Sequence, residues 1–216
     1  MNMGVALKKF IATIIVASYA ISTRATGLEN LESFVKTVKT GKADFTQVVT
    51  PPAKDGQVAR SKTSTGTFEF SRPGQFKFVY KKPFEQSIVA DGQTLWLHDV
   101  DLNQVTARKQ AQVLGATPAA LIASAVDLNA LRAEFTLAVA PDKEGLEWVT
   151  ATPKTKDGQV QSVRIGFRQG LLASLDILDS FGQNSRMSFH AFQANVPMDA
   201  ASFQFKAPTG ADVIRQ

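Results

Sequence analysis

The chain has 216 residues, a formal net charge of +5 and no cysteine. The absence of cysteine excludes disulfides, thiolate metal sites and a catalytic thiol. Lys8, Lys9 and Arg24 supply three of the positive charges within the first 25 residues, which contain no acidic residue, so the remainder carries only +2 and lacks the basic patch expected of a nucleic-acid-binding protein.

The first 25 residues have the pattern of a secretory signal peptide. Lys8 and Lys9 precede a twelve-residue apolar run at 10–21, which is shorter than a transmembrane anchor, the alternative interpretation, requires. Small residues near its end predict cleavage after Ala25, leaving 26–216 as a single domain. No cysteine follows that could carry a lipid, so we expect a released protein and not a lipoprotein.

Two elements are expected early in the mature chain. Apolar residues recur at three- and four-residue steps between 28 and 40, which predicts an amphipathic helix ending near Gly41. Residues 43–50 indicate a strand, stopped by Pro51-Pro52. The polar segment 53–64 is expected to be a loop.

The stretch 66–99 is the most informative part of the chain. Its period-two alternation predicts three or four short antiparallel strands with one apolar face. Arg72-Pro73-Gly74 and Asp91-Gly92 mark turns, because proline fixes φ and glycine tolerates positive φ. The side chains expected on the apolar face are Phe68, Phe70, Phe76, Phe78, Ile88, Ala90, Leu95 and Leu97.

The remaining chain returns to strands after one helical interruption. Residues 110–131 are rich in Ala and Leu and predict short helices, with Thr117 as an N-cap and Pro118 in the first turn. The sequence therefore predicts about ten strands in one curved antiparallel sheet. The helices at 28–40 and 117–131 are the only evident candidates to cover its apolar face. The further strands are expected at 101–108, 133–140, 146–152, 159–168, 171–178, 183–192 and 203–205.

The aromatic composition leaves two possibilities for the interior. The chain has 15 Phe but only 2 Trp and 2 Tyr, so many rings without a polar group must be buried or line something apolar. Composition alone favours a packed core. An apolar cavity is the alternative.

Catalytic and metal-binding patterns are sparse. The two histidines, His98 and His190, are expected to be partly exposed strand residues, and two histidines without cysteine do not favour a zinc site. Asp99 and Asp101 lie close together, as turn residues often do. No G-x-S-x-G, P-loop or G-x-G-x-x-G sequence is present, so no enzyme, metal or cofactor is expected.

Several short motifs occur in a specific order along the mature chain. FSRPGQFKF at 70–78 is followed by Lys82-Pro83, by VADG at 89–92 with Leu95-Trp96, by DVDLNQVT at 99–106 and by FQFKAP at 203–208. Together they resemble the LolA family of periplasmic outer-membrane lipoprotein carriers. Each motif alone is weak, and the order and spacing make the resemblance specific.

The resemblance implies a mainly β, open half-barrel of about ten or eleven antiparallel strands, with a helical lid over an apolar cavity. It implies a monomeric periplasmic chaperone of a Gram-negative bacterium, without cofactor. Such a carrier takes triacylated lipoproteins from an inner-membrane ABC transporter to an outer-membrane receptor.

The resemblance also assigns site residues. Arg72 matches the family's latch arginine, which bonds to the lid backbone, here at Ile122 and Ala123. Without the resemblance, Arg72 would be interpreted as an ordinary turn arginine. The side chains implied to line the acyl cavity are Phe45, Phe68, Phe70, Phe76, Phe78, Ile88, Leu95, Leu97, Leu121 and Ile122.

Two other functions remain open from the sequence. The same fold can carry an enzyme on its sheet face, because fold does not fix function. A lipid-sensing regulatory domain is the second, although such proteins tend to carry a further domain. The outer-membrane receptor shares the fold but needs an acylated cysteine, which is missing here.

Overall fold

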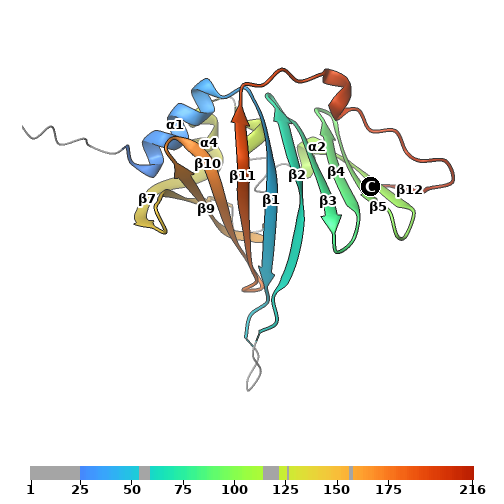
Figure 1. Ribbon diagram of the computed structural model, residues 1–216, viewed down its shortest axis with the longest axis horizontal. Coiled ribbons are helices and arrows are strands. Elements are labelled where there is room, and N and C mark those ends of the chain that lie inside the picture. Colours follow the sequence, from blue (N-terminus) through green and yellow to red (C-terminus); the bar gives the residue numbers. More distant parts are fainter. Residues whose placement is uncertain (1–24, 54–58, 114–121, 126, 156–157) are drawn as a thin grey trace, which may run out of the picture.

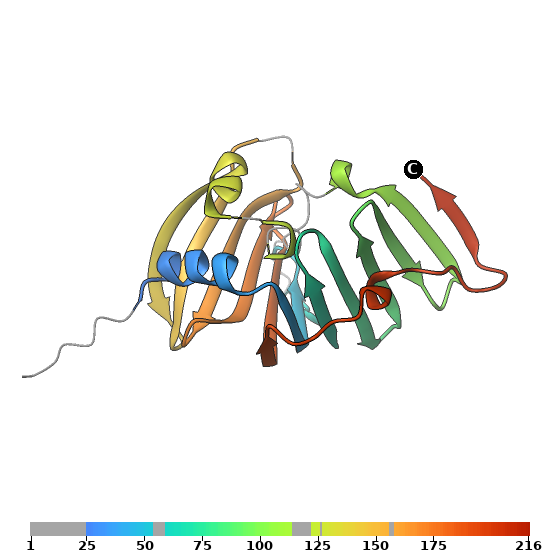
Figure 2. The ribbon, with the colours of Figure 1, turned by 90° about the horizontal axis from the view of Figure 1, so that it is seen from above.

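A single twelve-stranded sheet forms the body of the protein, and it curves around the helices (Figures 1 and 2). The computed structural model describes residues 25–53, 59–113, 122–125, 127–155 and 158–216. The strand order is β12-β6-β5-β4-β3-β2-β1-β11-β10-β9-β8-β7, and every neighbouring pair except β12–β6 is antiparallel. The sheet is open, with β12 and β7 at its edges. In these ranges, no helix combines the length and apolarity needed to cross a bilayer.

The strands are joined mostly by short turns. Gly74 and Gly92 adopt positive φ in the β2–β3 and β4–β5 turns, which confirms the turns expected at these glycines. The strand bounds are β1 (Thr40–Thr50), β2 (Lys62–Ser71), β3 (Gln75–Lys82), β4 (Gln86–Asp91), β5 (Thr94–Asp99), β6 (Gln104–Lys109), β7 (Phe135–Lys143), β8 (Leu146–Pro153), β9 (Val160–Arg168), β10 (Leu171–Asp179), β11 (Asn184–Ala194) and β12 (Asp212–Arg215).

The strand register places the predicted apolar residues on one face. Phe68 lies opposite Phe78, and Phe70 lies opposite Phe76. The row continues into β4 and β5 through directly opposed apolar pairs. Each buried phenylalanine contributes about 2 kcal/mol to folding, so this concave face is a main source of stability. The alternation predicted for 66–99 is therefore confirmed.

Helix α1 (Gly27–Thr37) lies against the concave face over β7–β10, as Figure 2 shows. A capping box starts it: the Thr26 side chain accepts from the Glu29 N–H, and the Glu29 carboxylate accepts from the Thr26 N–H. Leu31, Phe34 and Val35 are buried against the sheet. The helix predicted at 28–40 is thus present but ends three residues earlier, because the chain turns into β1.

The central helical segment is shorter and more divided than the predicted 117–131. Its described parts are α2 (Gln110–Val113), the helical residues 122–124 and α4 (Leu128–Glu134), which Asp127 caps. Thr117 and Pro118, the predicted cap, lie outside the described residues. The strand predicted from 133 begins two residues later, at Phe135, since α4 continues through Glu134.

The end of the chain differs from the prediction. Residues 200–203 form the 3-10 helix η2 (Ala200–Phe203), so the strand predicted at 203–205 is wrong. The last strand is β12, which pairs in parallel with β6 at the sheet edge. Its four residues are all exposed and show no alternation of burial, so periodicity could not identify it.

Candidate functional site

The turn between β2 and β3 connects the sheet to the helices above it through hydrogen bonds. Arg72 follows the last residue of β2, and its backbone N–H donates to the carbonyl of Lys39, just after α1 (2.8 Å). Pro73 and Gly74 complete the turn. This position brings the Arg72 side chain under both α1 and the segment at 122–124.

The Arg72 guanidinium donates to backbone carbonyls of two separate segments. Nε and Nη2 donate to the Ile122 carbonyl (3.0 and 2.5 Å). Nη1 donates to the carbonyls of Val35 and Val38 (both 2.9 Å) and Phe34 (3.3 Å). The last carbonyls of a helix lack intrahelical partners and carry partial negative charge, so a cation there satisfies and stabilises them. One side chain therefore caps α1 and holds the central segment.

The surroundings of the guanidinium are largely apolar. Its carbon lies 5.0 Å from the ring centre of Phe34 and 5.4 Å from that of Phe70, distances typical of cation–π contacts. Burial lowers the pKa of Arg72 to about 10, which leaves the group charged at neutral pH. Removal of this partly buried cation is costly, because it would leave backbone carbonyls without a donor.

The predicted contact of Arg72 with Ala123 takes a different form. The Ala123 carbonyl accepts from the backbone N–H of Gly74 (3.0 Å) and not from the arginine. The turn and the segment at 122–124 therefore join through backbone as well as side chain. Ile122 and Ala123 are both buried, so this segment packs onto the interior.

Gln110 is a buried residue of this site that the sequence analysis did not identify. Its Nε2 donates to the Gly74 carbonyl (2.6 Å), and its Oε1 accepts from the Gly92 N–H (3.0 Å). It thereby joins the β2–β3 and β4–β5 turns at the base of α2. No sequence signal singles out one glutamine among many.

The residues predicted to line the cavity lie together in the interior. Ile88 and Leu97 are half-buried and pack against the same cluster, and Leu121 lies outside the described residues. The buried members are Phe45, Phe68, Phe70, Phe76, Phe78, Leu95 and Ile122.

The aromatic rings of this cluster contact one another. Phe68 stacks on Phe78 with 4.4 Å between ring centres, and it lies 5.5 Å from Phe189. Phe45 meets Phe78 edge-on at 5.7 Å. In this form the rings pack as a core, so a bound fatty chain would have to separate them or the helices above them.

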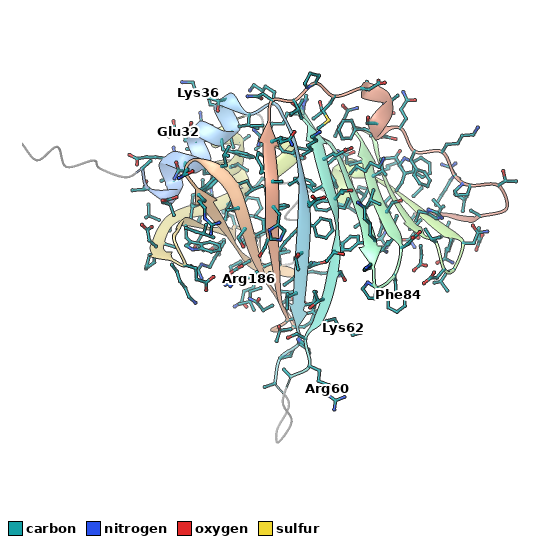
Figure 3. The ribbon with its side chains drawn as sticks, in the orientation of Figure 1. Glu32, Lys36, Arg60, Lys62, Phe84 and Arg186 are labelled. Atoms are coloured by element: carbon teal, nitrogen blue, oxygen red, sulfur yellow. The ribbon has the colours of Figure 1, made fainter. Side chains whose placement is uncertain are left out.

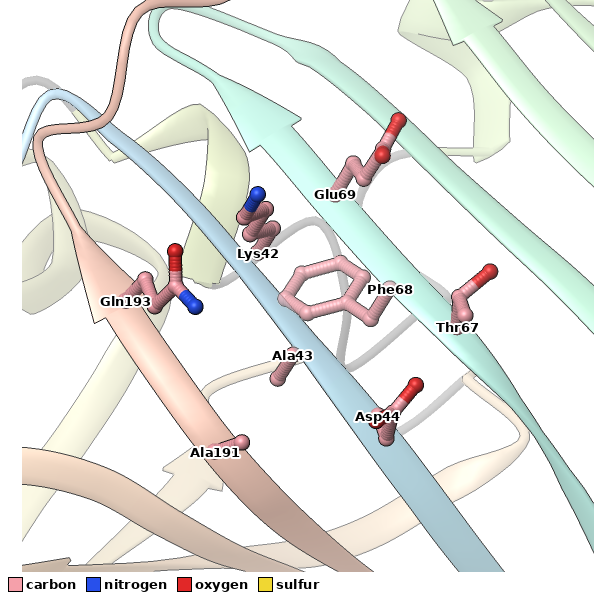
Figure 4. Close-up of a pocket in the computed structure, with 8 residues that line it drawn as sticks. All are labelled: Lys42, Ala43, Asp44, Thr67, Phe68, Glu69, Ala191 and Gln193. Carbon is pink, nitrogen blue, oxygen red and sulfur yellow. The ribbon is translucent and has the colours of Figure 1, made fainter.

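Two hollows among the described residues have several charged side chains in their linings. One, of about 230 Å³, lies over β11, β1 and β2, where Lys42, Asp44 and Glu69 surround it (Figure 4). The other, of about 340 Å³, lies between α1 and α4 and is lined by Lys36, Arg132 and neighbouring polar groups. Their charged linings do not suit a fatty chain.

The fold and the site define a half-barrel binding protein, in which an arginine fastens helices over the apolar face of an open sheet. The chain belongs to the LolA family: the model for the outer membrane lipoprotein carrier protein LolA matches residues 36–206. Carriers of this family are chaperones and not enzymes, which confirms the expectation of a non-enzymatic protein.

Relatives of known name cover nearly the whole chain. The outer-membrane lipoprotein carrier protein of Albidiferax ferrireducens is 69% identical over 212 residues, which are 96% of this chain and 100% of that protein. That of Leptothrix cholodnii is 51% identical over 195 residues, or 90% and 88% of the two chains. The crystal structure of an uncharacterized conserved protein from Thermus thermophilus shares the fold, with a TM-score of 0.52, 11% identity and coverage of 88% and 96%.

Proposed function

We propose that this protein is a periplasmic carrier that shields the acyl chains of lipoproteins between two membranes. The observation that carries the proposal is the Arg72 turn, which fastens two helical segments over a phenylalanine-rich interior in a member of the lipoprotein-carrier family. The predicted signal peptide agrees with export, since its cleavage would leave residues 26–216 beyond the inner membrane.

The energy of acyl chains explains why such a carrier is needed. A sixteen-carbon chain buries roughly 15 apolar carbons, worth about 12 kcal/mol at about 0.8 kcal/mol each. A triacylated lipoprotein therefore cannot leave a membrane unprotected at a useful rate. A carrier that recovered all of this energy could not release its cargo, so part of the energy must be offset.

The Arg72 contacts supply such an offset. Cargo entry requires the rings beneath α1 and Ile122 to separate, which strains or breaks the hydrogen bonds from the guanidinium to Ile122 and to Val35 and Val38. The ligand-free form is then stabilised relative to the open one, and this difference weakens net cargo affinity. We infer that Arg72 favours release to the acceptor.

The expected partners are those that the resemblance to the family implies, and the energy of acyl transfer agrees with them. Loading requires a machine that extracts lipoproteins and supplies energy, which fits an inner-membrane ABC transporter. Unloading requires an acceptor that binds acyl chains more tightly than this carrier, which fits an outer-membrane lipoprotein receptor. The interior residues expected to contact the chains are Phe45, Phe68, Phe70, Phe76, Phe78, Ile88, Leu95, Leu97, Leu121 and Ile122.

Substitution of Arg72 tests the proposal. In Arg72→Leu the carbonyls of Ile122, Val35 and Val38 lose a charged donor, which costs about 1–3 kcal/mol per group left unsatisfied and favours the open form. We expect purified Arg72→Leu to retain more acylated cargo, seen by mass spectrometry, and to transfer it to receptor more slowly. Arg72→Lys should behave similarly, because one ammonium cannot reach both segments.

Arg108→Leu provides the matched control. Arg108 lies on β6, and its side chain donates to the Gln216 side chain at the exposed sheet edge. Its removal should leave cargo retention and transfer unchanged. If Arg72→Leu transfers cargo at the wild-type rate, Arg72 does not act as a latch. If no variant co-purifies with acyl chains, the proposed carrier function is wrong.

A further inference from the structure

One polar atom in the segment held by Arg72 is buried without a hydrogen-bond partner. Ser124 is the last of the helical residues 122–124, and its hydroxyl oxygen is buried although part of the residue is exposed. Among the described residues, no donor or acceptor bonds to this oxygen. Burial of an unpaired hydroxyl destabilises a fold, so such a group in a native structure calls for an explanation.

The neighbours of Ser124 lie at the boundary between the helical segments and the apolar interior. Ile122, Ala123 and Ala125 all belong to the buried cluster that contains the phenylalanines. The Ile122 carbonyl accepts from Arg72, and the Ala123 carbonyl accepts from the Gly74 N–H, so hydrogen bonds fix the backbone on the N-terminal side of Ser124. The closed form therefore keeps the Ser124 hydroxyl away from solvent for as long as these bonds hold.

A second buried serine shows the usual arrangement. Ser174 lies on β10, and its hydroxyl donates to the Met187 carbonyl on β11 (3.1 Å). Ser174 is part of the sheet, which stays in place when helices are lifted from it. Ser124, in contrast, belongs to a segment that must be displaced when acyl chains enter. Of these two serines, the one without a partner is thus the one that cargo entry would uncover.

We propose that the Ser124 hydroxyl donates a hydrogen bond to the carbonyl oxygen at the head of a bound acyl chain, in an ester or an amide. This inference rests on the proposed carrier function. Fatty chains are apolar, so the carbonyls that join them to the cargo are the polar groups that enter beside them. A hydroxyl donor and a carbonyl acceptor are complementary. The new bond offsets part of the hydrogen bonding that Arg72 loses on opening, and it favours acyl chains over plain hydrocarbon.

Binding of lipopeptides that differ in their carbonyls tests this contact. The full probe is a synthetic cysteine peptide with two ester-linked chains on an S-glyceryl group and one amide-linked chain on its amino group. Because the protein has no cysteine, Phe84→Cys gives a single immobilisation point for surface plasmon resonance, at the end of the sheet opposite Glu32 and Lys36 of α1 (Figure 3). In this background, Ser124→Ala should bind the full probe about fivefold more weakly, as expected for one hydrogen bond. Ser124→Thr keeps the hydroxyl and should bind within twofold of the unsubstituted chain.

Two altered probes identify the carbonyl. The diether probe has methylene groups in place of the two ester carbonyls, and the diacyl probe lacks the amide-linked chain. If an ester is the acceptor, the effect of Ser124→Ala disappears with the diether probe and persists with the diacyl probe. If the amide is the acceptor, the two results are exchanged. An effect that persists with both altered probes, or no effect with the full probe, would overturn the carbonyl contact.

Thermal unfolding of the cargo-free protein provides an independent test. Ser124→Ala removes an unpaired hydroxyl and should raise the midpoint by about 2–4 °C. The matched control, Ser174→Ala, deprives the Met187 carbonyl of its donor, so it should lower the midpoint and leave probe affinity unchanged. A lower midpoint for Ser124→Ala would show that its hydroxyl is already paired, and would also overturn the proposal.

The same binding measurements separate this contact from the carrier function. If the unsubstituted chain binds none of the probes, the carrier function is wrong and the Ser124 contact is wrong with it. If that chain binds the full probe and Ser124→Ala binds it equally well, only the Ser124 contact is wrong.

Discussion

At the scale of single residues, Arg72 connects sequence to function most directly. A charged side chain at a tight turn is common, but this one is partly buried and donates only to backbone carbonyls at the end of α1 and at Ile122. Its contacts with the carbonyls at the α1 end were not part of the prediction. Arg72 thereby joins two helical segments, because the last carbonyls of α1 and the carbonyl of Ile122 both lie within hydrogen-bonding distance of its guanidinium.

Asp91 is a second residue whose environment gives a testable consequence. Its carboxylate accepts from the N–H groups of Thr94 (2.7 Å) and Gln93 (2.8 Å) and from the indole N–H of Trp96 (2.9 Å). Burial by itself would raise the pKa of Asp91, but these donors outweigh it and hold the pKa below the usual 3.8. The charged form thus stabilises the β4–β5 turn.

The lowered pKa sets the direction of the pH dependence. Because Asp91 releases its proton more readily when folded, its stabilisation is complete above about pH 4 and is lost as the pH falls through the folded pKa. We expect Asp91→Asn to unfold at a lower urea concentration than the wild type at pH 7. The difference between the two urea midpoints should be smaller at pH 3. Urea midpoints at the two pH values measure this. A gap that stays constant would contradict the assigned role.

At the scale of elements, α1 depends on a close approach to the sheet. Gly27, its first residue, lies so near β8 that an added Cβ would be 2.2 Å from the Trp148 carbonyl carbon and oxygen. The approach allows Leu31, Phe34 and Val35 to reach the concave face. The position of the carbonyls that Arg72 binds therefore depends on where α1 starts as well as on where it ends.

Gly27→Ala should be strongly destabilising for this reason. Backbone atoms of β8 cannot move like a flexible side chain, so α1 must shift, at a cost of about 2–3 kcal/mol, the range for overpacking. Gly158→Ala is the control, since the nearest atom to its added Cβ is 3.9 Å away. Chemical denaturation compares the two. Similar stability of both variants would contradict the close packing of α1.

At the scale of the whole molecule, the open sheet must protect its two edges. At one edge, β12 pairs with β6 and offers only four residues, which include the charged Asp212 and Arg215. Short, charged edge strands resist pairing with other chains. The C-terminal segment reaches this edge across the outer face, where Phe205 stacks on Trp96 with 5.2 Å between ring centres.

Removal of β12 should therefore promote self-association. A chain that ends at Gly210 leaves the backbone groups of β6 unpaired along the whole edge. We expect concentration-dependent oligomers in analytical ultracentrifugation. Val213→Thr with Ile214→Thr keeps β12 and its hydrogen bonds, so that variant should sediment as the wild type does. A truncated chain that remained monomeric would contradict protection by β12.

Features that depend on neighbours along the chain could be predicted from the sequence alone. Alternation in 66–99 indicated which phenylalanines share a face, because side chains of a strand point alternately to its two sides. Glycines that require positive φ marked the turns, and the three- and four-residue steps located α1. The order of the motifs was sufficient to indicate the family.

Contacts between segments distant in sequence became known only from the folded chain. The parallel β12–β6 pair, the two hydrogen bonds of Gln110 and the α1 carbonyls around Arg72 each join residues more than 15 positions apart. Local periodicity carries no information about such partners. The physical reason is that a buried donor or acceptor must be satisfied by whichever group the completed fold brings near it.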